Sequence, residues 1–407
     1  MTLYANRDER NLTERLFPTE RPVGLTGAEI MKAQDPVEVR QIIGGSCRRL
    51  NYNGRMDIFQ RGINTTVSGS SSMEQYVADR FFIGLRTNNY TISATRDTSD
   101  HPSEFNSCLK LTNGTGVAGT ASSNVVLGYG PFEGWQTHDF AWGTPYAKDL
   151  TISFWVKSSV PGIYSVQLIN YGSGNAQAFR EYHIKHAGSW QWCSVTFNGC
   201  NSLGTTNILT DRALVVNWSL GAGPTDRIDE SVQDWVTTGG NWRGTNDSVE
   251  WSAVTGATFQ ITGVQMETGP VATEFAYRSY PEEVALCQRY FCKSYGVEVE
   301  PGTNTNDGLR MGRNFDAGSA RSDVPGYTEF PVTMRVTPSI TFYAKDGTVN
   351  KIRLGSSTGG DTSAGSNSSV TGGTNGPSGI GHLRSSTSVP AAAFYYFHYT
   401  AAADFYD

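Results

Sequence analysis

The sequence predicts an all-β protein: a β-sandwich followed by a smaller β domain, with a short and partly helical N-terminal arm. Three observations lead to this fold class. Many short segments alternate apolar and polar residues, as half-buried strands do. Glycine is abundant, at 45 of 407 residues, so turns are frequent. All nine tryptophans lie between Trp135 and Trp251, which marks the middle of the chain as a distinct unit.

The chain divides into three predicted parts: an arm over 1–50, a sandwich over 51–280 and a C-terminal β domain over 281–407. The arm has 15 charged residues and only two aromatic ones, so it has too little apolar surface for an independent domain. Capping signals predict one short helix in it, between Asp35 and Gly44. We expect the arm to become ordered by packing on another surface.

Four segments of the predicted sandwich show the period-two pattern of strands: 150–157, 163–168, 214–220 and 259–266. In the last of these the alternation changes face at Gly263, which predicts a β-bulge. The apolar faces of the other three segments should form the core. Those core side chains are Leu150, Ile152, Phe154, Val156, Tyr164, Val166, Leu168, Leu214, Val216, Trp218 and Leu220.

The predicted C-terminal domain opens with a helix. Ser279 is a capping residue and Pro281 takes an early helical position. Val284, Cys287 and Tyr290 follow at helical spacing, so they should share one apolar stripe.

Strands are predicted again at 330–336, 339–344 and 392–401. Between Gly355 and Gly379, 19 of 25 residues are Gly, Ser or Thr. A tract of this composition has little to bury, which predicts a long loop.

One segment strongly resembles bacteriophage tail-fibre and related virion appendage proteins, the run QITGVQMETGPVATEFAYRSYPEEVALCQRYF at 260–291. Matches to the same family follow in the same order at 56–62 (MDIFQRG), 76–82 (YVADRFF) and 132–159. The ending, FPVTMRVTPSITFY with the final FHYTAAADF, is similar to the small C-terminal domain of such proteins. The resemblance therefore covers roughly 51–407.

The resemblance implies a jelly-roll sandwich like a carbohydrate-binding module, on a virion-surface protein that is often a homotrimer. It implies attachment to host glycans and a location on the virion after synthesis in the host cytoplasm. The matching motifs themselves have architectural explanations. Asp79 and Arg80 should each pair locally, and Phe275 should fill the core.

Composition excludes several other classes. The formal charge of −6 argues against nucleic-acid binding, which needs a clustered basic face. No apolar run of about 18 residues predicts a membrane-spanning helix. The six cysteines lack the spacing of a zinc site and are too few for a disulfide framework in a chain of this length. No cofactor motif occurs, so none is expected.

The leading candidate for glycan contact is the insertion between Gly221 and Trp251, because it places aromatic rings beside carboxylates. Sugar rings stack on flat aromatic faces, and carboxylates accept hydrogen bonds from hydroxyl groups. We assign the carbohydrate site to Trp235, Trp242, Asp229 and Asp234. The alternative is that this insertion packs on its own sandwich or on a neighbouring subunit.

Three further tryptophans lie on the polar side of predicted strands: Trp155, Trp190 and Trp192. They are expected to cover a second layer or a subunit interface, where amphipathic tryptophan is favoured. Stacking on sugar is the alternative.

The arm alternates arginines with acidic residues. Arginine suits desolvated carboxylate partners, so Arg7, Arg10, Arg15 and Arg21 are assigned to docking on other virion proteins. The alternative is a solvated tail of mixed charge.

We expect no enzymatic activity and no metal site. Glycoside hydrolysis needs two suitably spaced carboxylates, and Glu133, Asp139, Asp229 and Asp234 are merely available acids. No coil repeat of the depolymerase type occurs. The leading prediction is thus a non-catalytic receptor-binding protein. A structural virion protein (head fibre, capsid decoration or tail scaffold) is the alternative, and a glycan depolymerase is less favoured.

Overall fold

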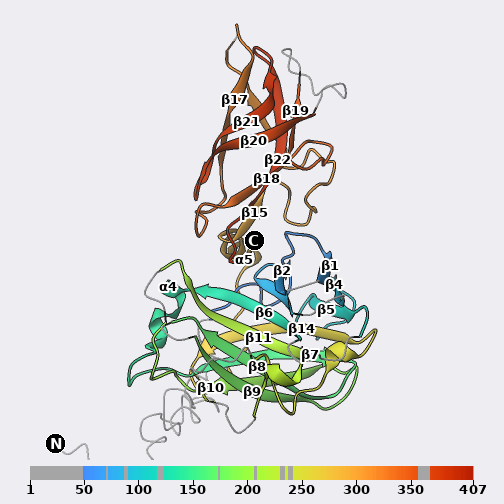
Figure 1. Ribbon diagram of the computed structural model, residues 1–407, viewed down its shortest axis with the longest axis vertical. Helices are drawn as coiled ribbons and strands as arrows, with labels where there is room; N and C mark the ends of the chain where they lie inside the picture. The colour runs from blue at the N-terminus through green and yellow to red at the C-terminus, as the bar shows by residue number, and fades with distance from the viewer. Residues whose placement is uncertain are drawn as a thin grey trace, which may run out of the picture.

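A computed structural model gives the fold of the chain (Figure 1). It describes residues 49–69, 72–86, 90–116, 123–172, 175–205, 209–229, 234–236, 242–316, 318–355 and 367–406. The protein is nearly all β, as predicted. The arm helix predicted between Asp35 and Gly44 and the four docking arginines, Arg7, Arg10, Arg15 and Arg21, lie outside the described residues.

Two six-stranded antiparallel sheets form the sandwich. Sheet A has the order β1 (Asn64–Gly69), β4 (Tyr90–Asp97), β5 (Cys108–Asn113), β14 (Thr258–Thr268), β7 (Leu150–Ser158), β10 (Gln191–Phe197). Sheet B has the order β2 (Ser72–Ala78), β3 (Phe81–Arg86), β6 (Asn124–Glu133), β11 (Arg212–Ala222), β8 (Gly162–Asn170), β9 (Ala176–Ile184).

The chain crosses between the sheets repeatedly, from β5 to β6 to β7 to β8 and again from β9 to β10 to β11 to β14. This wrapped connectivity is that of a jelly roll. Short elements lie in its connections: α4 (Gly134–Thr137), the 3₁₀ turns η1 (His138–Phe140), η2 (Pro224–Asp226) and η3 (Trp251–Ala253), and a parallel pair, β12 (Arg227–Ile228) and β13 (Gly244–Thr245).

The inner faces of both sheets make one core, and the eleven side chains predicted for it are all in it. The predicted bulge is also present. The pairing of β14 with β7 shifts between Thr262 and Gln265, and Gly263 has a φ of +62°. Left-handed backbone of this kind favours glycine, which explains the residue at this position.

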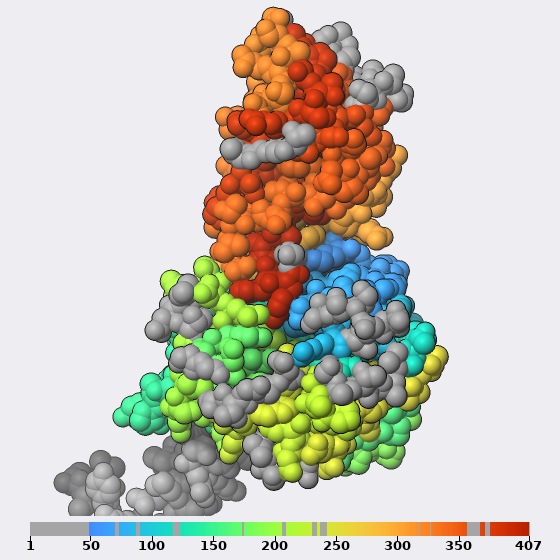
Figure 2. All heavy atoms as spheres, viewed as in Figure 1, coloured from blue at the N-terminus to red at the C-terminus, as the bar shows by residue number. Residues whose placement is uncertain are grey.

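A second β unit follows the predicted helix, α5 (Tyr280–Gln288). Val284 and Cys287 of this helix are buried together with Tyr290, which lies just after it. Its main sheet has the order β15 (Phe291–Lys293), β22 (Phe394–Ala402), β19 (Lys351–Leu354), β20 (Asn367–Gly376), β21 (Gly379–Val389), β17 (Arg321–Glu329). β16 (Arg310–Arg313) and β18 (Ser339–Tyr343) also pair with β22. Figure 2 shows this unit projecting from the sandwich.

Two predictions for this unit were wrong. The segment 330–336 is bent rather than extended, although Phe330 and Met334 are buried in the second core. The second half of the Gly/Ser/Thr tract forms β20, which pairs with β21 through its backbone. Backbone hydrogen bonds need no apolar side chains, so composition alone underestimated this strand.

Buried ion pairs connect the two units. Asp404 accepts hydrogen bonds from Arg80 (2.7 Å) and Arg61 (2.6 Å). Glu133 accepts two bonds from Arg289, both 2.7 Å, on the other side of the junction. The prediction that Arg80 pairs locally was wrong, because its partner is 324 positions away.

The described cysteines are all free. Neither α4 nor α5, nor any other helix in the described ranges, has the length and apolarity that crossing a membrane requires.

Candidate functional site

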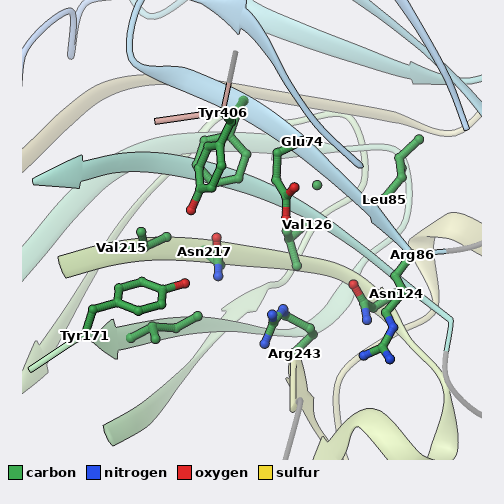
Figure 3. A pocket seen from close by; sticks show the side chains of 13 residues that line it. Glu74, Leu85, Arg86, Asn124, Val126, Tyr171, Val215, Asn217, Arg243 and Tyr406 are labelled. Carbon is green, nitrogen blue, oxygen red and sulfur yellow. The ribbon is translucent and has the colours of Figure 1, made fainter. Parts of the chain in front are cut away.

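The outer face of sheet B carries the candidate site. Strand alternation turns Leu214, Val216 and Trp218 of β11 into the core, so Val215 and Asn217 point outward. A cavity of about 290 Å³ lies on this outer face, and we call it the sheet B groove (Figure 3). Its lining residues are Glu74, Phe82, Gly84, Leu85, Arg86, Asn124, Val126, Ile169, Tyr171, Val215, Asn217, Arg243 and Tyr406.

Aromatic rings build one side of the groove. Tyr406, from the end of the chain, packs edge-on against Phe82 with ring centroids 4.8 Å apart. Phe82 in turn lies over Gly128, where a Cβ atom would be only 2.1 Å from the Phe82 ring. Glycine at this position therefore lets the ring lie close to the sheet. Burial raises the pKa of the Tyr406 phenol, which keeps it a neutral hydrogen-bond donor.

A second tyrosine lies across the groove. Arg212 places its guanidinium 3.8 Å from the ring centroid of Tyr171. Figure 3 shows the rings of Tyr171 and Tyr406 on either side of Asn217. The groove thus has two partly exposed phenol rings separated by an amide.

A buried amide chain fixes the floor. Asn217 donates to Gln167 (3.0 Å), and Gln167 donates to Gln177 (2.7 Å) and to the backbone carbonyl of Trp242 (2.6 Å). Because these donors are committed, the orientation of the Asn217 amide is set by the network. Its Oδ1 atom is buried and has no hydrogen-bond partner among the described residues. An unsatisfied acceptor in a cavity wall is suited to a ligand hydroxyl group.

The charges around the groove are mostly positive. Arg86 and Arg243 line it, and neither forms an ion pair within the described part of the chain. Glu74 is the one carboxylate among the described lining residues. Asn124 is held by a 2.6 Å hydrogen bond to Asp226, whose backbone carbonyl also accepts from the Arg243 amide. A chain with a net charge of −6 thus presents a locally basic groove.

None of the four predicted carbohydrate residues is among the described lining residues of this groove. The Trp242 carbonyl accepts from Gln167, and the next residue, Arg243, lines the groove. Trp235 is further away, against Trp142 with centroids 4.9 Å apart, and its indole donates to the Asn198 carbonyl.

The two predicted carboxylates are exposed. Asp234 contacts Arg180 and Asn198 at 3.3 and 3.2 Å, on the same side of the sandwich as Trp235. Asp229 follows β12 and is not among the described lining residues of the groove.

Sequence reasoning missed the residues that line the groove itself. The outward position of Asn217 followed from the alternation of its strand, but its lack of a partner did not. Tyr406 reaches the groove from more than 180 positions beyond Asn217, so no local signal marks it.

The four acids considered for hydrolysis are dispersed. Glu133 is fully buried and holds Arg289 and the Tyr290 hydroxyl (2.6 Å), whereas Asp139, Asp229 and Asp234 are exposed. Within the described ranges, no group of three or more His, Cys, Asp or Glu residues is arranged to hold a metal ion.

No family model matches the chain, and no curated protein matches its sequence. Similar solved structures include the enzymatically active domain of tailspike protein 4 of bacteriophage CBA120 (8% identity, 54% of this chain, 21% of that chain, TM-score 0.27). Another is a tandem pair of CBM22 domains from Paenibacillus barcinonensis Xyn10C (8% identity, 88% and 90%, TM-score 0.28).

A third is the N-terminal cellulose-binding domain of Cellulomonas fimi β-1,4-glucanase C (10% identity, 52% and 97%, TM-score 0.25). This chain spans about a fifth of the tailspike chain. TM-scores this low do not establish a common topology, so a function has to be argued from the geometry of the groove.

Proposed function

We propose that this protein binds glycans without cleaving them, and that the sheet B groove takes an acidic sugar. The observation that carries the proposal is the buried, unpartnered Oδ1 of Asn217 in a cavity flanked by two tyrosines and two arginines.

Each part of the groove matches one feature of an acidic glycan. The faces of Tyr171 and Tyr406 suit the C–H surfaces of a pyranose ring, and the Asn217 oxygen accepts from a hydroxyl group. Arg86 and Arg243 suit a sugar carboxylate, because guanidinium groups bind carboxylates through paired hydrogen bonds.

The groove supports binding rather than hydrolysis. Glycoside hydrolysis uses two carboxyl groups on either side of the scissile bond. Glu74 alone supplies a carboxyl group among the described lining residues.

We further propose that the protein is a bacteriophage tail-fibre or receptor-binding protein, carried on the virion as a homotrimer. The support is the sequence resemblance at 260–291 and in the three segments before it. The arm, with Arg7, Arg10, Arg15 and Arg21, would dock on other virion proteins, and the sandwich would contact the host surface. Display of several copies strengthens weak sugar contacts through avidity.

The test is calorimetric titration of the full chain with oligogalacturonate, which is acidic, and with cello-oligosaccharide of equal length, which is neutral. We expect the acidic oligomer to bind more tightly. Arg243→Ala should weaken that binding about tenfold, since a hydrogen bond to a charged group is worth about 1.5–3 kcal/mol. Tyr146→Ala changes a residue that is 83% exposed and outside the groove, so it serves as the control.

Equal binding of both oligomers, or no effect of Arg243→Ala, would contradict the acidic-glycan assignment. For the virion assignment, imaging of the parent particle should place the protein at the tail. A position on the capsid lattice, with no glycan binding, would instead indicate the structural role.

A further inference from the structure

The opposite outer face of the sandwich carries a second cavity, of about 500 Å³, which we call the sheet A pocket. Its floor is a cross-strand pair of tryptophans. Trp155 of β7 and Trp192 of β10 are direct register partners, and both point away from the core. Trp192 is 50% exposed and Trp155 is half-buried, so indole surface is open to a ligand.

The bulge in β14 shapes the inner end of the pocket. A Cβ atom on Gly263 would lie 2.6 Å from the Phe105 ring and 3.1 Å from Trp155. The glycine therefore allows both rings to approach the strand. Phe105 packs edge-on against Phe275, with centroids 5.2 Å apart, and Tyr277 lies edge-on to Phe275 at 5.1 Å.

Buried polar side chains hold the loop that forms the outer wall. Gln265 accepts from the Ala276 amide (2.7 Å) and donates to the Glu274 carbonyl (3.1 Å). Glu267 accepts from the amide (2.9 Å) and the hydroxyl (2.6 Å) of Thr273. Both Gln265 and Glu267 are fully buried, so this wall is fixed by the core of the sheet.

The charge of the sheet A pocket is negative. Its charged lining residues in the described ranges are Glu104 and Glu274, both exposed, and neither forms an ion pair there. Arginines do lie behind the wall. Arg49 stacks on Phe275 and is paired with Glu283, and Arg55 is paired with Asp57 at 3.1 Å.

Those partners hold the arginines behind the wall, where Glu283 is also paired with Arg278 at 3.5 Å, whereas the two glutamates line the pocket itself. Open indole faces beside unpaired carboxylates are suited to a cation, because the negative face of the ring and the carboxylates attract it together. The size also fits a small ligand. A cavity of about 500 Å³ lies within the range of small-molecule sites.

We infer that the sheet A pocket binds a sugar ring that bears an ammonium group, as in a glycan that contains an unacetylated amino sugar. The ring lies against Trp155 and Trp192, and the ammonium group is placed between Glu104 and Glu274. This site is separate from the sheet B groove, and its charge preference is the opposite one.

The test is to titrate the full chain with a glucosamine tetramer and with its N-acetylated counterpart. Binding is measured from the change in tryptophan fluorescence. The two probes share ring and linkage but differ in charge. We expect the glucosamine tetramer to bind at least about tenfold more tightly than the acetylated one, and Glu274→Gln to weaken it about three- to tenfold. Trp192→Ala should abolish the fluorescence change.

Matched controls separate this site from the sheet B groove. Trp135→Ala removes another partly exposed tryptophan, and it should leave glucosamine binding unchanged. Arg243→Ala should also leave glucosamine binding unchanged, although this variant weakens binding of the acidic oligomer. Trp192→Ala should weaken binding of the glucosamine tetramer and leave binding of the acidic oligomer unchanged. A wrong assignment of one site is therefore distinguishable from a wrong assignment of the other.

Three results would overturn the inference. Equal binding of the acetylated tetramer would show that the charge of the ammonium group does not contribute to binding. Equal binding of choline, which has the ammonium group without the ring, would show that the pocket does not recognise the sugar ring. Absence of binding, together with dissociation of an oligomer on Trp192→Ala, would show that this face is a contact between copies of the chain.

Discussion

The two outer faces of the sandwich share one structural device and differ in chemistry. On each face a glycine lets a phenylalanine ring approach a strand, Gly128 beneath Phe82 on sheet B and Gly263 beneath Phe105 on sheet A. The sheet B groove then adds arginines and an unpartnered amide, whereas the sheet A pocket adds tryptophans and glutamates.

The faces also differ in what completes them. The sandwich and its own loops supply the sheet A pocket. The sheet B groove requires Tyr406, which follows the last strand of the C-terminal unit. A jelly roll thus offers two similar platforms, and the segments that reach each platform decide its ligand chemistry.

The largest expected effect is on the link between the C-terminal unit and sheet B. Asp404→Ala leaves the guanidinium of Arg80 buried without its carboxylate, which costs about 3–5 kcal/mol. Tyr406 should then leave its place on Phe82, so binding of the acidic oligomer falls while glucosamine binding persists. Urea unfolding and both titrations measure this.

Asp323→Ala is the matched control, because it removes an exposed ion pair with Arg384, and exposed pairs contribute little to stability. Equal loss of stability in the two variants would show that Asp404 does not anchor the tail.

The next effect is on the sheet A pocket alone. Gly263→Ala places a Cβ in left-handed backbone and against Phe105, which should cost about 2–4 kcal/mol and abolish glucosamine binding. Gly256→Ala separates the cost of the left-handed backbone from the cost of the contact with Phe105. Gly256 has a φ of +72°, but nothing lies within 4 Å of its Cβ position. If both variants lose the same stability, Phe105 does not constrain this site.

A smaller effect is expected on the sheet B groove. Gly128→Ala pushes against the Phe82 ring in ordinary extended backbone, at a cost of about 1–3 kcal/mol. The same change in a Phe82→Ala background should cost about 1 kcal/mol less, as a double-mutant cycle would show. Gly376→Ala, in a strand with nothing within 4 Å, is the control. Full additivity would rule out the proposed contact.

The smallest effect concerns pH at the edge of sheet A. Burial raises the pKa of Asp100, but hydrogen bonds from Lys157, Trp190 and Gln260 outweigh it and hold the pKa below its usual value. As pH falls below about 4, the unfolded chain takes up this proton first, so the stabilising contribution of Asp100 is lost.

Comparison of urea unfolding at pH 7 and pH 3.5 measures this loss. The wild-type protein should lose about 0.2–1 kcal/mol more between these values than Asp100→Asn does. Identical losses would show that the contacts of Asp100 do not stabilise the fold.

Local patterns predicted much of the fold. Alternation placed all eleven proposed side chains in the core, and the change of face at Gly263 located the bulge. The helix after Ser279 was likewise confirmed. Each depends on interactions within a few residues, which a sequence displays directly.

Predictions that depended on distant partners did less well. Phe275 was expected in the core, but it is half-buried in the wall of the sheet A pocket, since Gln265 holds its loop on the outer face. The 330–336 segment has apolar alternation but bends, because its burial comes from the second core rather than from strand pairing.

The sequence by itself determined the all-β class and, for several strands of the sandwich, their position and which side is apolar, because these follow from the two-residue period of the extended chain. The tertiary structure alone decided which outward residues meet. Tyr406, Asn217 and Arg243 share one groove only because strands of sheet B, an insertion and the last residues of the sequence converge there. Contact between residues far apart in sequence depends on that convergence, and no local pattern records it.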